Sequence, residues 1–468
     1  MEVATLLKGV VLATTMLVSG LPSAGLAQTP PPSPADSASA DSASLALPEK
    51  NFKRAALEVT GVNVGIWLFC RYIREGGTNT GFRIGLQSWK ENLLNGFEWD
   101  DNNFATNQFA HPYHGSMYFC SARANGFDFW ESIPFNFAGS AMWEYFGETH
   151  HASINDWIST SVGGIALGEM LHRFSLMVLD QQATGRERTW REIGGLFVNP
   201  MGEINRMFTG DIGRVGPNPP GRFPESFQAV LRGGLRFTGE ESLDNADTTR
   251  FFARLRAVHG DPEGSACRKP FDVFSLDAQV NFDDARPLGR VKSIGLLHSW
   301  ETHRGARASM VFAIVNNFDY INNRAYTYGG ESVGGSWLAR VKSDAWTLNA
   351  GAGLNWIILG GTSSDYASYT GRSYDYGPGG GATFYAVLRH RGGGLLALES
   401  DLYHLRIMNG TEATHLLAEN RLTLGLPLSG PLGIGTEYSV YHAERSYADF
   451  ADVSKRNPQL TAYLSWAY

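Results

Sequence analysis

From about residue 225 to the C-terminus, apolar and polar side chains alternate with a period of two. In residues 226–238, for example, Phe227 and Leu235 share one face, whereas Arg232 and Arg236 share the other. This period places successive side chains on opposite faces of a β-strand. Comparable runs cover 250–259, 271–282, 346–356 and 460–468, separated by Gly-, Asp- and Asn-containing breaks.

The alternating runs predict about twelve strands, most of them roughly 9–13 residues long, which is enough to cross an outer membrane at a tilt. The polar face repeats arginine, as at Arg254, which suits a wet or plugged lumen, and the chain stops on Tyr468 at the end of an alternating strand. We therefore predict an antiparallel transmembrane β-barrel over residues 223–468. A large soluble β-sandwich or barrel with a dry interior is the alternative.

The N-terminus has the pattern of a secretory signal. Lys8 precedes an apolar run from Val10 to Val18, and small residues lead to Ala27. The run is too short to span a bilayer, so we predict a signal peptide over residues 1–27. Residues 28–48, rich in Pro, Ser and Ala, predict a flexible linker.

Charge and cysteine content exclude some classes of protein. The net charge of −7 argues against a nucleic-acid partner. Three cysteines in 468 residues cannot form a disulfide framework. We expect Cys70, Cys120 and Cys267 to be buried free thiols, with one Cys70–Cys120 bridge left open.

Residues 49–215 have a helical pattern, with helices expected at 55–72, 111–125, 135–147 and 153–179. Ser153 and Asp156 form an acidic variant of the capping box at the start of the fourth. Gly163 and Gly164 in its middle cost about 1 kcal/mol each relative to alanine, so we expect another backbone or a ligand to approach there. The predicted fold class is α+β: a helical domain that plugs or caps the barrel, followed by the barrel.

Most of the chemistry-bearing residues lie between positions 107 and 173. Neutral histidines and carboxylates three or four residues apart share a helix face and can act as general acids and bases. The candidate catalytic residues are His111, His114, Glu144, Glu148 and Asp156. The candidate binding residues are Asn155, Arg232, Arg236 and Arg254.

The same residue types could hold a metal ion. The candidate ligands are His114, Glu144, Glu169 and His172, of which the last two form a Glu-x-x-His step typical of half a di-metal site. A helical wheel places Glu169 and His172 on the side opposite Asp156, so one site cannot easily use both sets. The structural alternative is a polar network that ties the helices to one another or to the barrel arginines, for example with Glu144 or Glu169 against Arg232, Arg236 or Arg254. The sequence specifies no cofactor.

Four linked motifs carry a resemblance to a known family. They are Asn107-Gln108 with His111-Pro112-Tyr113-His114-Gly115-Ser116, Trp143-Glu144-Tyr145 with Gly147-Glu148, Ser153-Ile154-Asn155-Asp156, and Gly163-Gly164 with Gly168-Glu169. In this order they resemble the bacterial domain of unknown function 3943, mainly over residues 85–180. The resemblance implies an exported envelope protein and supplies no activity. The Glu-bearing helix followed by an Asp-started, Gly-containing helix is also similar to VanZ-like membrane proteins.

Two functions follow as hypotheses. The first is an outer-membrane barrel of a Gram-negative bacterium with a plug-like helical domain and a structural or lipid- or solute-handling role. The second is an envelope enzyme, a hydrolase or lipid-modifying activity, that uses the His/Glu/Asp cluster. The expected partners are outer-membrane lipid and, through the strand that ends at Tyr468, the barrel-insertion machinery.

Overall fold

The structure is a computed structural model that describes residues 49–74, 80–100, 104–219, 221–244, 248–264, 266–282 and 287–468. The predicted signal peptide and linker lie outside these residues. The helical elements are α2 Phe52–Leu68, η1 Phe69–Arg74, η2 Thr80–Phe82, α3 Leu86–Asn95, η3 Thr106–Ala110, α4 His111–Ala124, α5 Phe129–Phe146, α6 Ile154–Ile158, η4 Ser159–Gly163, α7 Gly164–Val178, α8 Gly185–Val198, α9 Pro200–Thr209 and α10 Ala367–Thr370.

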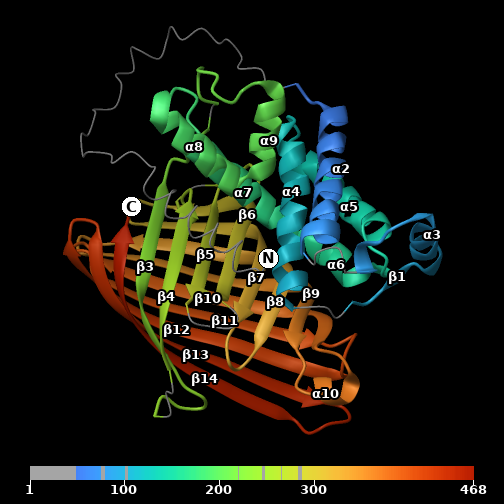
Figure 1. The fold of residues 1–468 in the computed structure, drawn as a ribbon. Coiled ribbons are helices and arrows are strands. Elements are labelled where there is room, and N and C mark those ends of the chain that lie inside the picture. Colours follow the sequence, from blue (N-terminus) through green and yellow to red (C-terminus); the bar gives the residue numbers. More distant parts are fainter. Residues whose placement is uncertain are drawn as a thin grey trace.

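Twelve antiparallel strands close into a barrel in which β14 pairs with β3 (Figure 1). They are β3 Phe227–Thr238, β4 Thr248–His259, β5 Phe274–Asn281, β6 Leu288–Arg304, β7 Ala308–Asn322, β8 Thr327–Lys342, β9 Trp346–Ser363, β10 Tyr374–His390, β11 Leu395–Arg406, β12 Ala413–Ser429, β13 Leu432–Tyr447 and β14 Val453–Ala467. A short parallel pair, β1 Phe97–Glu98 and β2 Ala152–Ser153, lies in the helical region. The predicted α+β fold class with a barrel of about twelve strands is confirmed.

The two ends of the barrel differ in their connections. At one end, the short-turn end, strands are joined across 305–307, 343–345, 391–394 and 430–431, and the C-terminus lies there too. At the opposite, loop end, the connections include 323–326, 364–373, 407–412 and 448–452. One long connection, 260–273 between β4 and β5, lies at the short-turn end.

The outer face of the barrel carries an apolar band toward the short-turn end. On β11–β14 this band consists of exposed side chains at Leu396, Leu398, Leu422, Leu424, Leu426, Leu432, Ile434, Leu464 and Trp466. Trp300, Trp337 and Trp346 continue it on β6, β8 and β9. Toward the loop end the outward positions of β11–β14 turn polar, as at His404, Arg406, Thr414 and Glu444. A band of this kind, edged with aromatic residues, is the pattern of a barrel wall that faces lipid.

Side chains of the barrel itself fill its interior. Ion pairs join strands that are not neighbours: Arg254 Nη1 lies 2.9 Å from Glu437 Oε1, and Lys292 contacts Asp401. Toward the loop end the filling becomes aromatic and includes Tyr326, Tyr328 and Tyr403. We call the charged layer the ion-pair belt; it comprises Arg254, Asp277, Arg290, Lys292, Asp401, Glu419, Arg421 and Glu437.

The helical region packs against the outside of the barrel wall, over β5–β10 (Figure 1). Asp319 contacts Lys292 in the lumen, so its neighbour Tyr320 points outward, where it meets Phe104 and Phe109. The expected plug is therefore corrected for the described helices: they line the wall, because the ion-pair belt and the tyrosines already fill the lumen.

Three local features differ from the sequence-based expectations. The helix expected from 135 begins at Phe129, because Asp128 and Glu131 form a capping box there. Ser153 does precede a helix, but its side chain caps no backbone N–H, so the capping box expected there is wrong. The helix 153–179 widens into a π turn at η4. Helices α3, α8 and α9 were not anticipated.

Two glycines explain how closely α4 and α7 approach. A Cβ on Gly115 would collide with the carbonyl oxygen of Thr160, and one on Gly164 would collide with the backbone of Gly115. The close approach expected at Gly163–Gly164 is made at Gly164 by the backbone of Gly115, and at Gly163 by the side chains of Pro112 and Glu331.

The three cysteines are free and buried, as expected. Among the described helices, none combines the length and apolar character needed to cross a bilayer.

Candidate functional site

Five titratable residues of the helical region gather beside the barrel wall. We call Asp100, His111, Glu144, Glu148 and Asp156 the wall cluster. The parallel pairing of β1 with β2 brings the segment that ends at Asp100 alongside the start of α6, while α4 and α5 supply His111 and Glu144. Four of the five were expected from the sequence.

The asparagine at the start of α6 connects the cluster to the barrel. The backbone N–H of Asp100 donates to Asn155 Oδ1 at 2.9 Å, and Asn155 Nδ2 donates to Asp156 Oδ1 at 3.0 Å and to the Tyr376 hydroxyl at 3.3 Å. Tyr376 is a fully buried, outward-facing residue of β10. Asn155 therefore links the helical region to the barrel wall through hydrogen bonds.

The two histidines occupy different surroundings. His111 Nδ1 lies 3.1 Å from Thr160 Oγ1, and its Nε2 lies 3.9 Å from Asp156 Oδ2. His114 Nε2 lies 2.6 Å from the Tyr118 hydroxyl, which in turn donates to Asn63. Burial lowers the pKa of His111 and lowers that of His114 to about 3, so both imidazoles are neutral at pH 7.

Burial and crowding favour the protonated form of the carboxyls. Glu144 Oε2 accepts the Ser153 N–H at 2.8 Å, yet burial and the nearby Asp156 and Glu148 raise its pKa well above the usual range. Burial, and then the carboxyl of Asp100, raise the pKa of Asp156. Burial raises the pKa of Glu148 to about 7, although Glu148, like Asp100, is partly exposed and Trp143 Nε1 donates to it at 3.0 Å.

This arrangement can store and exchange protons. Carboxyls that crowd together cannot all ionise, so some keep a proton at neutral pH. Asp100 and Asp156 share a hydrogen bond, the arrangement in which one carboxyl acts as an acid and the other as a base. Glu148, a partly exposed neighbour of this pair, would lose its proton near neutral pH.

The remaining candidates do not join the wall cluster. Glu169 accepts from Arg123 Nε at 2.7 Å and from Arg173 Nε at 2.9 Å, so both oxygens are occupied by guanidinium groups. His172 is half-buried, and desolvation, then the nearby Arg123 and Arg173, lower its pKa well below the usual value. Within the described ranges, no group of three or more His, Cys, Asp and Glu residues is placed to hold a metal ion.

The barrel arginines were expected to pair with these acids, and this expectation is wrong. Arg232 and Arg254 both contact Glu437 inside the barrel, and Arg254 also binds Asp277. Arg236 faces the lumen as well, because it pairs with Arg250 in the register that pairs Arg232 with Arg254. The physical reason is that the wall separates them from Glu144 and Glu169, which lie outside it.

Sequence reasoning missed two contributors to the site. Asp100 follows a two-residue strand with no periodic signal, and Tyr376 lies 220 positions beyond Asp156 on a strand that contains four glycines. No local pattern connects either residue to the helices. The outward placement of Tyr376, opposite the outward-facing Gly361, follows only from the register of the sheet.

Comparison with known proteins agrees with the motif-based interpretation. Residues 96–201 match the family described as "Domain of unknown function (DUF3943)". This segment of the chain is therefore similar to that family. The matched segment contains α4–α8, β1 and β2, and hence the whole wall cluster. The similarity to VanZ-like proteins is not supported, and no curated protein matches the chain.

Solved structures with a similar arrangement include three envelope proteins. The NanC porin is 12% identical and covers 51% of this chain and 98% of its own, with a TM-score of 0.28. The anion-selective porin from Comamonas acidovorans is 8% identical, with coverages of 52% and 99% and a TM-score of 0.23. Outer membrane phospholipase A from Escherichia coli is 11% identical, with coverages of 54% and 94% and a TM-score of 0.28.

Proposed function

We propose that this protein is an outer-membrane β-barrel of a Gram-negative bacterium with a structural or lipid- or solute-handling role, and that it does not form an open pore. The observation that carries this proposal is the closed barrel with an apolar band on its outer face. Such a band is stable only against lipid, because water would otherwise contact a continuous apolar surface.

Side chains of the ion-pair belt fill the lumen, which supports the proposal that the barrel has no open pore. Barrels larger than about eight strands usually leave a lumen, but here the contacts of Arg254 with Glu437 and of Arg256 with Glu399 cross it. These side chains also satisfy one another's charges, which buried charges require. Ions would have to break several such pairs to pass.

The helical region lies against the outside of the barrel wall, and this position supports a role on the side of the wall that faces lipid. The outer face of α2 exposes Leu57, Val64 and Leu68, and a Cβ on Gly61 or Gly65 would meet no atom within 4 Å. This face is uncharged between Lys53 and Arg71. The helices are thus attached where membrane-bound molecules, and not lumen solutes, would reach them.

Two measurements test the proposal. The protein should appear in outer-membrane fractions as a band whose gel mobility changes on boiling, as for a detergent-resistant barrel. Purified protein in planar bilayers should give no steady channel current. A soluble periplasmic location would contradict the membrane assignment, whereas long-lived porin-sized openings would contradict only the filled lumen.

A second function, an envelope hydrolase that acts on membrane lipid, is favoured by the Asp100–Asp156 pair with Glu148 at its edge. Hydrolysis of a fluorogenic phospholipid by the purified protein should then be lost in Asp156→Asn and retained in the control Asp344→Asn, an exposed carboxylate far from the cluster. Equal rates in both variants, or no turnover by the native protein, would contradict this function.

A further inference from the structure

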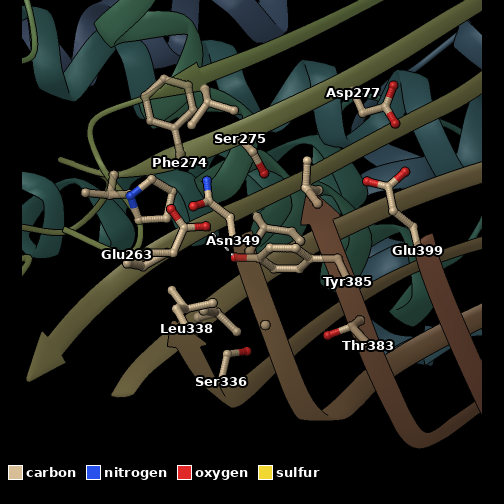
Figure 2. Close-up of a pocket in the computed structure, with 18 of the residues that line it drawn as sticks. Glu263, Phe274, Ser275, Asp277, Ser336, Leu338, Asn349, Thr383, Tyr385 and Glu399 are labelled. Carbon is tan, nitrogen blue, oxygen red and sulfur yellow. Dashed lines mark hydrogen bonds between the residues drawn. The ribbon is translucent and has the colours of Figure 1, made fainter. Parts of the chain in front are cut away.

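The barrel interior encloses a chamber between the ion-pair belt and the short-turn end. Its volume is about 180 Å³, and its lining includes Glu263, Leu338, Tyr385, Arg389 and Glu399 (Figure 2). Engineered cavities of about 150 Å³ accept a benzene ring, so the chamber has room for a small organic molecule.

The chamber has an apolar side. Val273, Leu296, Val315 and Leu338 belong to one buried cluster and line the cavity together. In Figure 2 the side chains of Leu338 and Tyr385 lie close to each other in the centre of the view. A molecule bound there would place an apolar body against this side.

The connection 260–273 partly closes the chamber at the short-turn end. Arg340 Nη1 donates to Asp261 Oδ2 at 2.8 Å, and its Nη2 donates to Glu263 Oε2 at the same distance. The Tyr385 hydroxyl donates to Glu263 Oε1 at 2.8 Å. These contacts occupy Asp261 and Glu263 and hold this part of the connection at the barrel mouth.

The charged groups around the chamber are matched, with one exception. Arg256 contacts Glu399 at 2.6 Å, Lys292 contacts Asp401, and Arg290 contacts Asp277 at 3.3 Å. The side chain of Arg389 makes no hydrogen bond or ion pair with any residue that the structure describes. Arg389 is exposed to solvent at the short-turn end, where the chamber opens, and is the lining cation whose donors no described residue occupies.

We infer that the chamber binds a small organic anion, a carboxylate with an apolar body, whose charge pairs with Arg389 and whose body rests on the side formed by Leu338 and its neighbours. A guanidinium binds a carboxylate through two parallel hydrogen bonds, which gives both strength and orientation. This inference rests on the solute-handling part of the proposed function and names the class of solute.

The test uses the full-length protein, folded in detergent, with benzoate as the probe. Calorimetry should show saturable binding of benzoate and about tenfold weaker binding of benzamide, which has the same shape without the charge. Inorganic sulfate, an anion with no apolar body, should bind more weakly than benzoate. Failure of benzoate to bind, or equal binding of benzamide, would overturn the inference.

Variants distinguish the chamber from general attraction to positive charge. Arg389→Gln should weaken benzoate binding about tenfold, and Arg389→Lys should restore part of it. The matched control is Arg391→Gln, which removes an exposed arginine that does not line the chamber. Equal losses in the two glutamine variants would overturn the inference.

Folding and location are checked separately from binding. Each variant must keep the heat-dependent gel mobility of the native protein, because a collapsed barrel would lose binding for another reason. A protein that shows this mobility in outer-membrane fractions and does not bind benzoate overturns the inference alone. A protein that binds benzoate and is found in the periplasm overturns the membrane assignment alone.

Discussion

Ser159 in η4 donates a hydrogen bond of 3.0 Å to Glu331 Oε1 on the outer face of β8. Glu331 pairs across the sheet with Phe318, whose neighbour Asp319 contacts Lys292 in the lumen, so Glu331 points away from the lumen. Both residues are buried. This contact, with those of Tyr376, fixes the helical region to the wall through polar groups that must find partners there.

Removal of this contact should loosen the helices and leave the barrel intact. Ser159→Ala strands the Glu331 carboxyl, at a cost of about 1–3 kcal/mol. Hydrogen exchange followed by mass spectrometry should show faster exchange over 154–178 and unchanged exchange in β11–β14. Thr60→Ala, at an exposed position of α2, serves as the control. Equal exchange in both variants would show that Ser159 does not hold the domain.

The glycine at the α4–α7 crossing should be irreplaceable, in contrast to one on α2. Gly115→Ala places a methyl group on the Thr160 carbonyl and should unfold the helical region at lower denaturant. Gly61→Ala, with open space around its Cβ, should raise helix stability by about 0.5–1 kcal/mol. Circular dichroism at 222 nm in urea measures both, and a stabilising Gly115→Ala would contradict the packing described.

Glu148 should titrate near neutral pH. Its pKa of about 7 lies above the usual value for glutamate, so the folded protein holds this proton more tightly than the unfolded chain. The contribution of this proton to the free energy of unfolding is fully present below about pH 4.5, the pKa of Glu148 in the unfolded chain. This contribution is lost as the pH rises to about 7.

Because the Trp143 indole donates to Glu148, tryptophan fluorescence should follow that titration with a midpoint near pH 7. The transition should vanish in Glu148→Gln and in Trp143→Phe. A transition that persists in Glu148→Gln would assign it to another group.

The barrel should lose less stability when both partners of an ion pair in the belt are replaced by apolar residues than when only one partner is replaced. Arg254→Met leaves Glu437 and Asp277 with one cation fewer and should destabilise the barrel by about 3–5 kcal/mol. Adding Glu437→Leu should recover part of this loss, and Arg304→Met, at an exposed pair with Glu301, should change little. The urea midpoint of the heat-dependent gel shift measures each effect.

The C-terminal aromatic should matter for assembly more than for the folded state. Tyr468 exchanges backbone hydrogen bonds with Ala229 and packs against Phe227, at the seam where β14 meets β3. Tyr468→Ser keeps the backbone pairing but removes the ring, so the folded protein should resist detergent as before. Export in cells should nevertheless yield less barrel and more unfolded precursor than the control Tyr369→Ser, an exposed loop residue.

The alternation of side chains was enough to predict the barrel, because a period of two shows which face each residue occupies. Arg232 and Arg254 indeed point inward, as their spacing indicated. The helical wheel likewise separated Glu169 from Asp156, as the structure does. Arg173, one partner of Glu169, lies four residues further along the same helix, a spacing that is visible in the sequence. The other partner, Arg123, was harder to predict, because only the packing of α4 against α7 brings it to Glu169.

The sequence by itself determined the strands, their two faces and the separation into a helical and a barrel part, since these depend on the local periodicity of apolar residues. Only the tertiary structure decided that the helices lie outside the wall. That choice depends on whether the lumen has room, and Arg254, Glu437 and Tyr328 fill it through contacts between distant strands. Asp100 joined the wall cluster, and Tyr376 came to lie beside it, for the same reason: register and packing, which are long-range properties, bring them together.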